Sequence, residues 1–243
     1  MPRAPAPLIF WDVDSQVDFM RPEGALYVSE AEELLPALGA LGAAARRHGI
    51  PVVASADHHS RADAEISDTP DWRITFPPHC MAGTAGAERV PETRLDDPLI
   101  LSSAEVEEAQ IEAGLARPRP EVLLLKQTLD VFSNANTEKV LRLLAPSRIV
   151  IYGVALDFCH RKAVEGLWSR GYRNLEVVVD GTKAIDGEGG ARLLESWREL
   201  GVKLVTAAQT IEGLGAGEAR GSNAVDGENL PSVGTDGAHV DLQ

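Results

Sequence analysis

The chain has 243 residues, of which 44% are hydrophobic and 25% charged, a balance close to the average for globular proteins with a sizeable core. Asp and Glu outnumber Lys and Arg by 37 to 23, so the formal net charge is −14. Nucleic-acid binding needs clustered positive charge, and this composition therefore argues against a nucleic-acid partner. No segment has the roughly twenty consecutive apolar residues of a membrane-spanning helix, so we expect no membrane insertion.

The cysteine content and the two ends of the chain bear on location and domain organisation. Two cysteines, Cys80 and Cys159, occur in a chain too long to need disulfides, and no signal-peptide pattern opens it, so a cytoplasmic protein is expected. Residues 1–6 and the Gly- and Asp-rich residues 215–243 are expected to be flexible. Residues 7–214 contain no repeat and no long linker, and we expect them to form a single domain.

Short apolar segments alternate with helix-like segments along this domain, which is typical of βαβ units. Most of these segments are apolar on both faces, as strands covered by helices on both sides should be. We therefore predict a doubly wound α/β fold with a mainly parallel sheet of about six strands and helices on both faces. In chain order the pattern predicts a strand at 8–14, a helix at 31–47, strands at 51–56 and, more weakly, 98–101, a strand at 121–126, a helix near 137–144, a strand at 148–154, a helix at 157–170, a strand at 175–180, a helix at 189–200 and a strand at 203–206.

Two parts of this pattern leave their structure open. The helix at 31–47 has apolar residues at three- and four-residue spacing, and Ser29 and Glu32 form a capping-box pattern at its start. Pro36 falls past the first turn, however, and disfavours an uninterrupted helix from that point. Residues 102–115 favour a helix by composition but are dominated by glutamate, so helix and loop both stay open.

Three of the predicted strands end in polar residues that a purely structural strand would not need: Asp14, Lys126 and, just after its strand, Cys159. Ligands of open parallel sheets bind beyond the carboxyl ends of the strands, so these side chains are candidates for a nucleophile, a proton-transfer group and a charge partner. Cys159 lies where a strand turns into a helix, and a helix N-terminus favours the thiolate. Each residue also has a structural interpretation, as a buried cysteine, a turn-capping aspartate and an edge lysine.

A second group of polar residues has the composition of a metal site. Asp57, His59 and His79 are potential ligands, and the first two share a face if the strand continues through them. Glu65 or Asp63 can add a carboxylate. Mixed imidazole and carboxylate ligands suit Zn, Fe or Mn better than Ca or Mg. A polar surface loop is the alternative interpretation.

Two further residues lie next to candidates without sharing their setting. Cys80 follows His79 but does not begin a helix after a strand, so a structural role is expected. His160 is adjacent to Cys159, but neighbouring helical residues diverge by about 100°, so the two side chains are expected to point apart. His58 should point away from the metal.

The motifs resemble those of the isochorismatase-like cysteine hydrolases, and more closely those of their nicotinamidase branch. Four features match in the expected order and span nearly all of the predicted domain. They are DSQVDF at 14–19, DHH with the later FPPHCMAGTAGAE between 57 and 88, the strand-terminal Lys126, and GVALDFC at 153–159.

This resemblance implies roles for the residues at the strand ends. Asp14 would take the proton of Cys159, and Lys126 would stabilise the resulting charges. The thiolate would then attack an amide carbonyl and form a thioester. The backbone N–H groups of Ala155 and Cys159 would bind the oxyanion, with the Val154–Ala155 peptide in the cis form.

The resemblance also implies one divalent metal, zinc in the first place and Fe or Mn as alternatives, that binds the substrate rather than making the nucleophile. Phe19 and Phe76 match aromatic positions that sandwich the substrate ring, although both can equally be core residues. Asp63 remains a competitor for the third ligand position. The implied ligands are Asp57, His59, Glu65 and His79.

The implied activity is hydrolysis of nicotinamide to nicotinate and ammonia, a reaction of NAD salvage. Alternatives are hydrolysis of another small amide, carbamoyl or ureido compound, and a non-catalytic metal-binding protein. The sequence departs from the family in LDFC, which replaces a more familiar TDxC, and in His160, so the pocket is expected to differ in shape. A small-molecule amide is the expected partner, and a homo-oligomer remains open.

Overall fold

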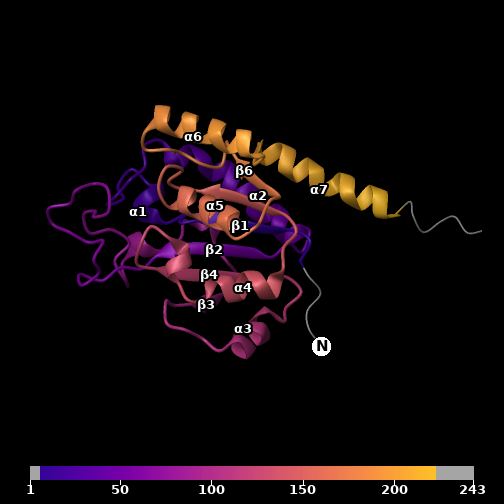
Figure 1. Cartoon of the computed structure of the whole chain (residues 1–243), viewed down its shortest axis with the longest axis horizontal. Helices are drawn as coiled ribbons and strands as arrows, with labels where there is room; N and C mark the ends of the chain where they lie inside the picture. The colour runs from indigo at the N-terminus through magenta and orange to yellow at the C-terminus, as the bar shows by residue number, and fades with distance from the viewer. Residues whose placement is uncertain (1–5, 223–243) are drawn as a thin grey trace, which may run out of the picture.

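The structure is a computed structural model that describes residues 6–222 of the chain (Figure 1). The flexibility predicted for the two ends falls mainly on residues 1–5 and 223–243, which lie outside the described range, and it stays a prediction. Ala6 is buried, and its N–H donates a hydrogen bond to the carbonyl of Leu144 at 2.7 Å. The described chain is therefore anchored from its first residue.

A single sheet of seven parallel strands forms the centre of the described chain (Figure 1). Its strands are β1 (Ile9–Val13), β2 (Val52–Asp57), β3 (Leu99–Leu101), β4 (Glu121–Lys126), β5 (Ile149–Gly153), β6 (Leu175–Val178) and β7 (Lys203–Val205). They lie in the order β3-β4-β2-β1-β5-β6-β7, and every pair is parallel. The sheet has more strands than the six or so predicted, because the weak segment at 98–101 does form the edge strand β3.

Helices cover both faces of the sheet, which confirms the doubly wound α/β prediction. They are α1 (Val17–Met20), α2 (Leu35–Arg47), α3 (Glu108–Leu115), α4 (Thr137–Leu144), α5 (Cys159–Ser169), α6 (Gly187–Leu200) and α7 (Ala207–Ser222), with 3-10 turns η1 (Ala31–Leu34), η2 (Ala85–Ala87), η3 (Pro91–Thr93) and η4 (Val131–Ser133). Trp11 of β1 packs in one core with α3 to α6, and Phe10 packs in a second core with α1, α2 and α7. Neighbouring residues of one strand thus serve opposite faces.

The helices differ from the sequence pattern at three places. The helix predicted at 31–47 begins as a 3-10 turn, and the α-helix starts at Leu35 because Pro36 fits only the first helical turn. Ser29 does not cap it, since Glu30 is the cap residue, with a φ of 63° and no side-chain hydrogen bond. The open segment at 102–115 forms α3 in its second half. Helix α7 continues past residue 214, where the sequence pattern places the end of the domain.

The strand order places the carboxyl ends of β4, β2, β1 and β5 side by side at one edge of the sheet. Strand β1 lies between β2 and β5, and the chain winds away from it in both directions, which makes this the switch point of the sheet. The register pairs Val13 with Gly153 across β1 and β5, and Asp57 with Lys126 across β2 and β4. The side chains that follow these strands therefore converge.

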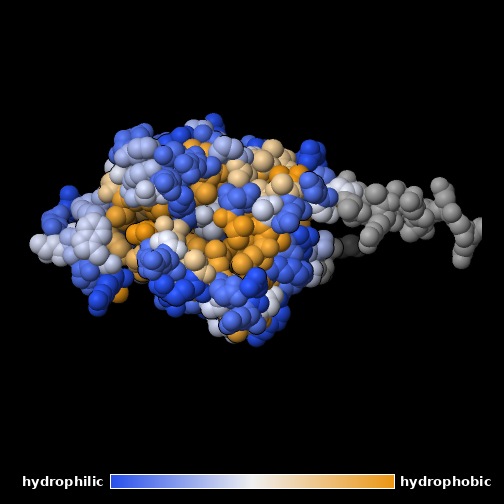
Figure 2. Space-filling model, turned by 90° about the horizontal axis from the view of Figure 1, so that it is seen from above, coloured by the Kyte–Doolittle hydropathy of each residue, from blue (hydrophilic) through white to orange (hydrophobic). Residues whose placement is uncertain are grey.

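The surface in Figure 2 is hydrophilic around an apolar area in the middle of the face shown. Large apolar side chains with more than half of their area exposed include Trp72, Ile74, Ile185 and Leu200. Within residues 6–222, no helix is both long and apolar enough to span a membrane. The expected cytoplasmic location, lack of a nucleic-acid partner and homo-oligomer stay predictions.

Candidate active site

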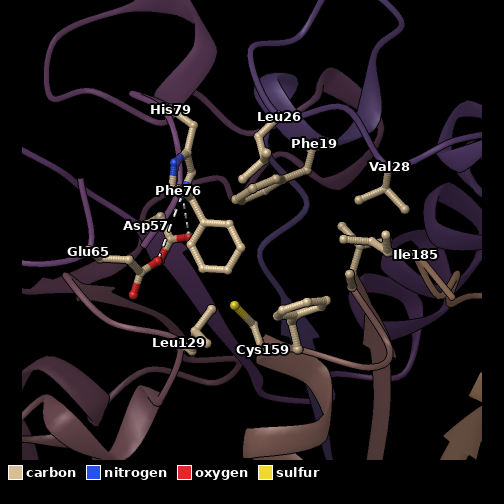
Figure 3. Close-up of a pocket in the computed structure, with 13 residues that line it drawn as sticks. Phe19, Leu26, Val28, Asp57, Glu65, Phe76, His79, Leu129, Cys159 and Ile185 are labelled. Carbon is tan, nitrogen blue, oxygen red and sulfur yellow. Dashed lines mark ion pairs between the residues drawn. The ribbon is translucent and has the colours of Figure 1, made fainter. Parts of the chain in front are cut away.

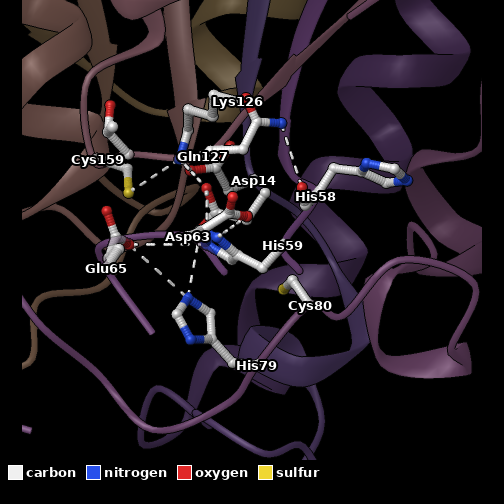
Figure 4. A network of polar contacts seen from close by, with 12 residues as sticks. Asp14, His58, His59, Asp63, Glu65, His79, Cys80, Lys126, Gln127 and Cys159 are labelled. Carbon is white, nitrogen blue, oxygen red and sulfur yellow. Dashed lines mark hydrogen bonds and ion pairs between the residues drawn. The ribbon is translucent and has the colours of Figure 1, made fainter. Parts of the chain in front are cut away.

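Asp14, Lys126 and Cys159 lie together in a buried cluster at the carboxyl edge of the sheet (Figure 4). The Lys126 Nζ atom lies 2.9 Å from Asp14 Oδ2 and 3.4 Å from Cys159 Sγ. Asp14 and Lys126 are fully buried, and Cys159 is 6% exposed. Three strand ends that are far apart in the sequence thus bring a carboxylate, an ammonium group and a thiol into contact.

Ser55 holds the Asp14 carboxylate from the neighbouring strand. Asp14 follows β1 with a φ of 47°, and its N–H still donates to the Ser55 carbonyl at 3.2 Å. The Ser55 hydroxyl donates to Asp14 Oδ1 at 2.6 Å, which leaves Oδ2 for Lys126. The sequence pattern did not single out Ser55, although it lies two positions before Asp57 and so faces the same side of the strand.

Lys126 also contacts Asp57, a pairing that the sequence analysis did not predict. Its Nζ donates to Asp57 Oδ1, because the register places the two residues opposite each other on β4 and β2. Burial opposes the charge on Lys126, but the carboxylates of Asp14 and Asp57 outweigh it and raise the lysine pKa well above its usual range. The ammonium group therefore stays charged and links the catalytic candidates to the metal candidates.

Burial of the Cys159 thiol acts against the thiolate-favouring effect of its place at the N-terminus of α5. Burial raises the pKa of Cys159 well above its usual range; Lys126 opposes this effect, and Asp14 adds to it. Burial also raises the pKa of Asp14, with Lys126 acting against it and Asp57 with it. A carboxylate with a raised pKa is a stronger base, which suits proton removal from a neutral thiol.

The turn between β5 and α5 presents backbone groups beside the thiol. The Val154–Ala155 peptide is cis, as the resemblance implies. The N–H groups of Ala155 and Cys159 donate no hydrogen bond to any other residue in the described part of the chain. Two free donors therefore lie within the turn that carries Cys159.

Asp57, His59, Glu65 and His79 form a second buried cluster next to the first. Figure 4 labels its two histidines and Glu65. Each offers one ligand atom, and these atoms lie within 4.8 Å of one another. The His79 Nδ1 atom is 2.8 Å from the Pro77 carbonyl, so Nε2 is the nitrogen that faces Asp57 and Glu65, at 3.6 and 4.0 Å. A backbone carbonyl on Nδ1 fixes the orientation of the ring and leaves Nε2 free to bind a metal.

The donor atoms of this cluster fit a divalent cation. Asp57 Oδ2, Glu65 Oε1 and both ring nitrogens of His59 are buried without a hydrogen-bond partner among the described residues. Burial and the nearby Asp57 carboxylate raise the pKa of Glu65 to about 7. Unpartnered buried polar atoms are costly, and a cation would satisfy Asp57 Oδ2, Glu65 Oε1 and His59 Nε2, the ring nitrogen that faces these two carboxylates.

Asp63, the competing ligand, lies outside this cluster. Its Oδ2 accepts a hydrogen bond from the Ser60 N–H at 2.7 Å and lies 3.5 Å from His59 Nδ1, on the far side of the imidazole ring from Nε2. The His59 Nε2 atom faces Asp57 and Glu65, each at 3.8 Å. The geometry therefore favours Glu65 over Asp63 as the third ligand.

Comparison with known proteins identifies the family of the chain. The sequence profile of the isochorismatase domain matches residues 8–103 and 102–209 of the chain. The chain belongs to the isochorismatase family. The nicotinamidase/pyrazinamidase of Mycobacterium tuberculosis is 28% identical over 197 residues, covering 81% of this chain and 97% of that protein.

Solved structures of other proteins share the fold. The pyrazinamidase of Pyrococcus horikoshii in complex with zinc has a TM-score of 0.65 and 26% identity, covering 82% of this chain and 99% of that chain. The N-carbamoylsarcosine amidase of Thermoplasma acidophilum has a TM-score of 0.63 and 23% identity, covering 82% and 96%. The family expected from the four motifs is thus confirmed.

The pocket of this isochorismatase-family chain lies between the two clusters and is mostly apolar (Figure 3). Phe19 and Phe76, the aromatic residues predicted from the sequence, both line it. Phe158 lies edge-on to Phe76 with ring centroids 5.7 Å apart. The sequence analysis missed several wall residues, because apolar residues scattered over loops carry no pattern. These residues are Leu26, Val28, Leu129, Phe158 and Ile185.

Three residues near the clusters take no part in them. Cys80 is buried with its Sγ 3.9 Å from the Gly86 carbonyl, and burial raises its pKa, so its thiol is inert. The His160 ring contacts the Gly153 carbonyl, as expected from a side chain that points away from Cys159. His58 is exposed, as predicted.

Proposed function

We propose that this chain is a metal-dependent amidohydrolase that converts nicotinamide to nicotinate and ammonia. The observation that carries the proposal is the contact between two buried clusters: Lys126 bonds to Asp14 and Cys159 on one side and to Asp57 of the metal cluster on the other. The 28% identical relative named nicotinamidase/pyrazinamidase supports the substrate, and the 26% identical pyrazinamidase in complex with zinc supports the metal.

The nucleophile is Cys159, and Asp14 moves its proton. Asp14 accepts the proton from the thiol as the sulfur attacks the amide carbonyl, which forms a C–S bond and a tetrahedral oxyanion. Collapse of this intermediate breaks the C–N bond, and the proton on Asp14 passes to the nitrogen so that ammonia leaves. Water then adds to the thioester, with Asp14 taking its proton, and the acid leaves as the thiol re-forms.

The charges that develop in these steps have partners in the chain. The free N–H groups of Ala155 and Cys159 support the assignment of an oxyanion hole. Lys126 stays charged and compensates the carboxylate and the developing thiolate. Phe19 and Phe76 line the pocket as flat apolar walls for a heteroaromatic ring.

The residues that would hold the metal are Asp57, His59, Glu65 and His79. Their imidazole and carboxylate donors favour zinc, with iron or manganese as alternatives. Bound there, a divalent cation would act as a Lewis acid that binds the ring nitrogen of the substrate and orients the substrate.

The proposal is tested by ammonia release from nicotinamide and from a panel of small aliphatic, carbamoyl and ureido amides. The wild type is compared with Cys159→Ala and His79→Ala, with zinc content measured on each protein. We expect Cys159→Ala to lose at least a thousandfold in kcat while keeping its metal, because no other group can form the thioester. We expect His79→Ala to lose metal and to show a raised KM first.

The outcomes separate the alternatives. Turnover by Cys159→Ala at the wild-type rate would contradict the mechanism. Fast hydrolysis of a carbamoyl or ureido compound, without hydrolysis of nicotinamide, would show that the substrate is another amide. Bound zinc without turnover of any amide would make the chain a non-catalytic metal-binding protein.

A further inference from the structure

The Gln16 side chain joins the end of β1 to the backbone of Asp57. Gln16 is buried; its Oε1 accepts from the Asp57 N–H at 2.7 Å, and its Nε2 donates to the Asp57 carbonyl at 2.8 Å. Nε2 also donates to the Ala87 carbonyl at 2.8 Å. The chain turns away from β1 at Asp14, so the Gln16 amide takes over the pairing that a strand backbone would make with β2.

Asp18, two residues after Gln16, holds the backbone next to His79, another residue of the metal cluster. Its Oδ2 accepts from the Cys80 N–H at 2.6 Å, and its Oδ1 accepts from the Ala25 N–H at 2.9 Å. The Cys80 carbonyl in turn accepts from the His59 N–H at 3.0 Å. The backbone at Gly86 packs closely against the Asp18 carboxylate: a Cβ at Gly86 would lie only 2.3 Å from both carboxylate oxygens.

From these contacts we infer that Gln16 and Asp18 are positioning residues for the metal site. Gln16 fixes the backbone of the ligand Asp57, and Asp18 fixes the segment that carries the ligand His79. The inference rests on the metal site of the proposed function and extends it to two residues that line neither the metal cluster nor the pocket. Ligands held in place before the ion arrives lose less freedom on binding, so removing such supports weakens metal affinity 10–100-fold.

The test is the affinity of the full chain for Zn²⁺, measured by competition with a chromophoric chelator. Gln16→Met keeps the length of the side chain and removes its three hydrogen bonds. Asp18→Asn keeps the shape and replaces one acceptor oxygen with an amino group. We expect each variant to bind Zn²⁺ 10–100-fold more weakly while circular dichroism shows a folded chain. A merely structural role would lower the stability of the metal-free protein and leave the Zn²⁺ affinity unchanged.

Matched controls carry the same chemical changes far from the cluster. Gln110→Met on α3 and Asp96→Asn before β3 alter exposed side chains, and both should bind Zn²⁺ like the wild type. A Gln16 or Asp18 variant that binds Zn²⁺ normally, or that fails to fold, overturns the inference for that residue. A wild type that binds no Zn²⁺ refutes the metal site of the proposed function. Normal Zn²⁺ binding by the wild type and by both variants refutes only the positioning role of Gln16 and Asp18.

Discussion

Two buried basic side chains of this molecule differ in charge: Lys126 is charged and His160 is neutral. Lys126 keeps its ammonium group because Asp14 and Asp57 outweigh the loss of water, and its pKa rises. His160 has no carboxylate partner within residues 6–222; burial lowers its pKa to about 4, and the hydrogen bond to the Gly153 carbonyl opposes this only in part. Its ring stacks on Trp197 with centroids 6.1 Å apart. His160 is thus a neutral residue of the core.

This neutral His160 makes stability fall at acidic pH. The ordinary histidine pKa is about 6.5, so between about pH 6.5 and 4 the unfolded chain holds a proton at this residue that the native chain does not. The contribution of His160 to the free energy of unfolding is therefore fully present above this window. It is lost as the pH drops through the window, by about 1.4 kcal/mol per pH unit. Urea unfolding at pH 7 and pH 5 should show a loss about 2 kcal/mol larger for the wild type than for His160→Asn.

The comparison isolates one residue, because His160→Asn keeps every other titratable group. His58→Asn, at an exposed position, should respond to pH like the wild type. Equal losses in the wild type and His160→Asn would contradict a neutral buried imidazole.

Strands and their ends were predictable at the element scale, because a strand covered on both faces leaves a continuous apolar run. That logic placed Asp14, Lys126 and Cys159 at one edge of the sheet without knowledge of the strand order. Register was not predictable, so the Lys126–Asp57 pair was missed. The rise in the Cys159 pKa was not predictable either, because a helix N-terminus is visible in a sequence pattern, whereas the depth of burial is not.

The contact between β1 and β5 sets the distance between Asp14 and Cys159, and Gly153 makes this contact possible. Its φ is 105°, and a Cβ at this position would lie 2.0 Å from the Val13 carbonyl oxygen. We expect Gly153→Ala to lower the free energy of unfolding by about 3 kcal/mol or more, from backbone strain plus steric overlap. Urea unfolding measures this loss, and ammonia release should fall with it as Cys159 moves away from Asp14.

Gly171→Ala is the matched control for this change. Gly171 also has a positive φ, of 92°, but nothing lies within 4 Å of the added Cβ. Only the backbone strain of about 1–2 kcal/mol remains, and activity should be kept. Equal destabilisation by the two variants would show that close approach of the strands is not the constraint.

At the scale of the whole molecule, the metal cluster brings together residues from a strand end and from a long loop. Asp57 ends β2, while His59, Glu65 and His79 come from the long segment before η2. This segment contacts α1 through the Cys80 N–H, which donates to Asp18, and β4 through the His58 N–H, which donates to the Lys126 carbonyl at 2.9 Å. A cation bound at the cluster would therefore stabilise the arrangement of two strands and a long loop, not only four side chains.

Metal should consequently raise the stability of the entire domain. A ligand that binds only the native state adds about 2.7 kcal/mol at a free concentration one hundred times its dissociation constant. For a domain of this size each kcal/mol shifts the melting temperature by roughly 2–4 °C, so zinc added to chelator-treated protein should raise the melting temperature by about 5–10 °C. Differential scanning calorimetry with and without Zn²⁺ measures the shift. His79→Ala, which lacks one ligand, should melt at a temperature that responds little to Zn²⁺. A shift of the same size in that variant would place the stabilising ion elsewhere on the protein.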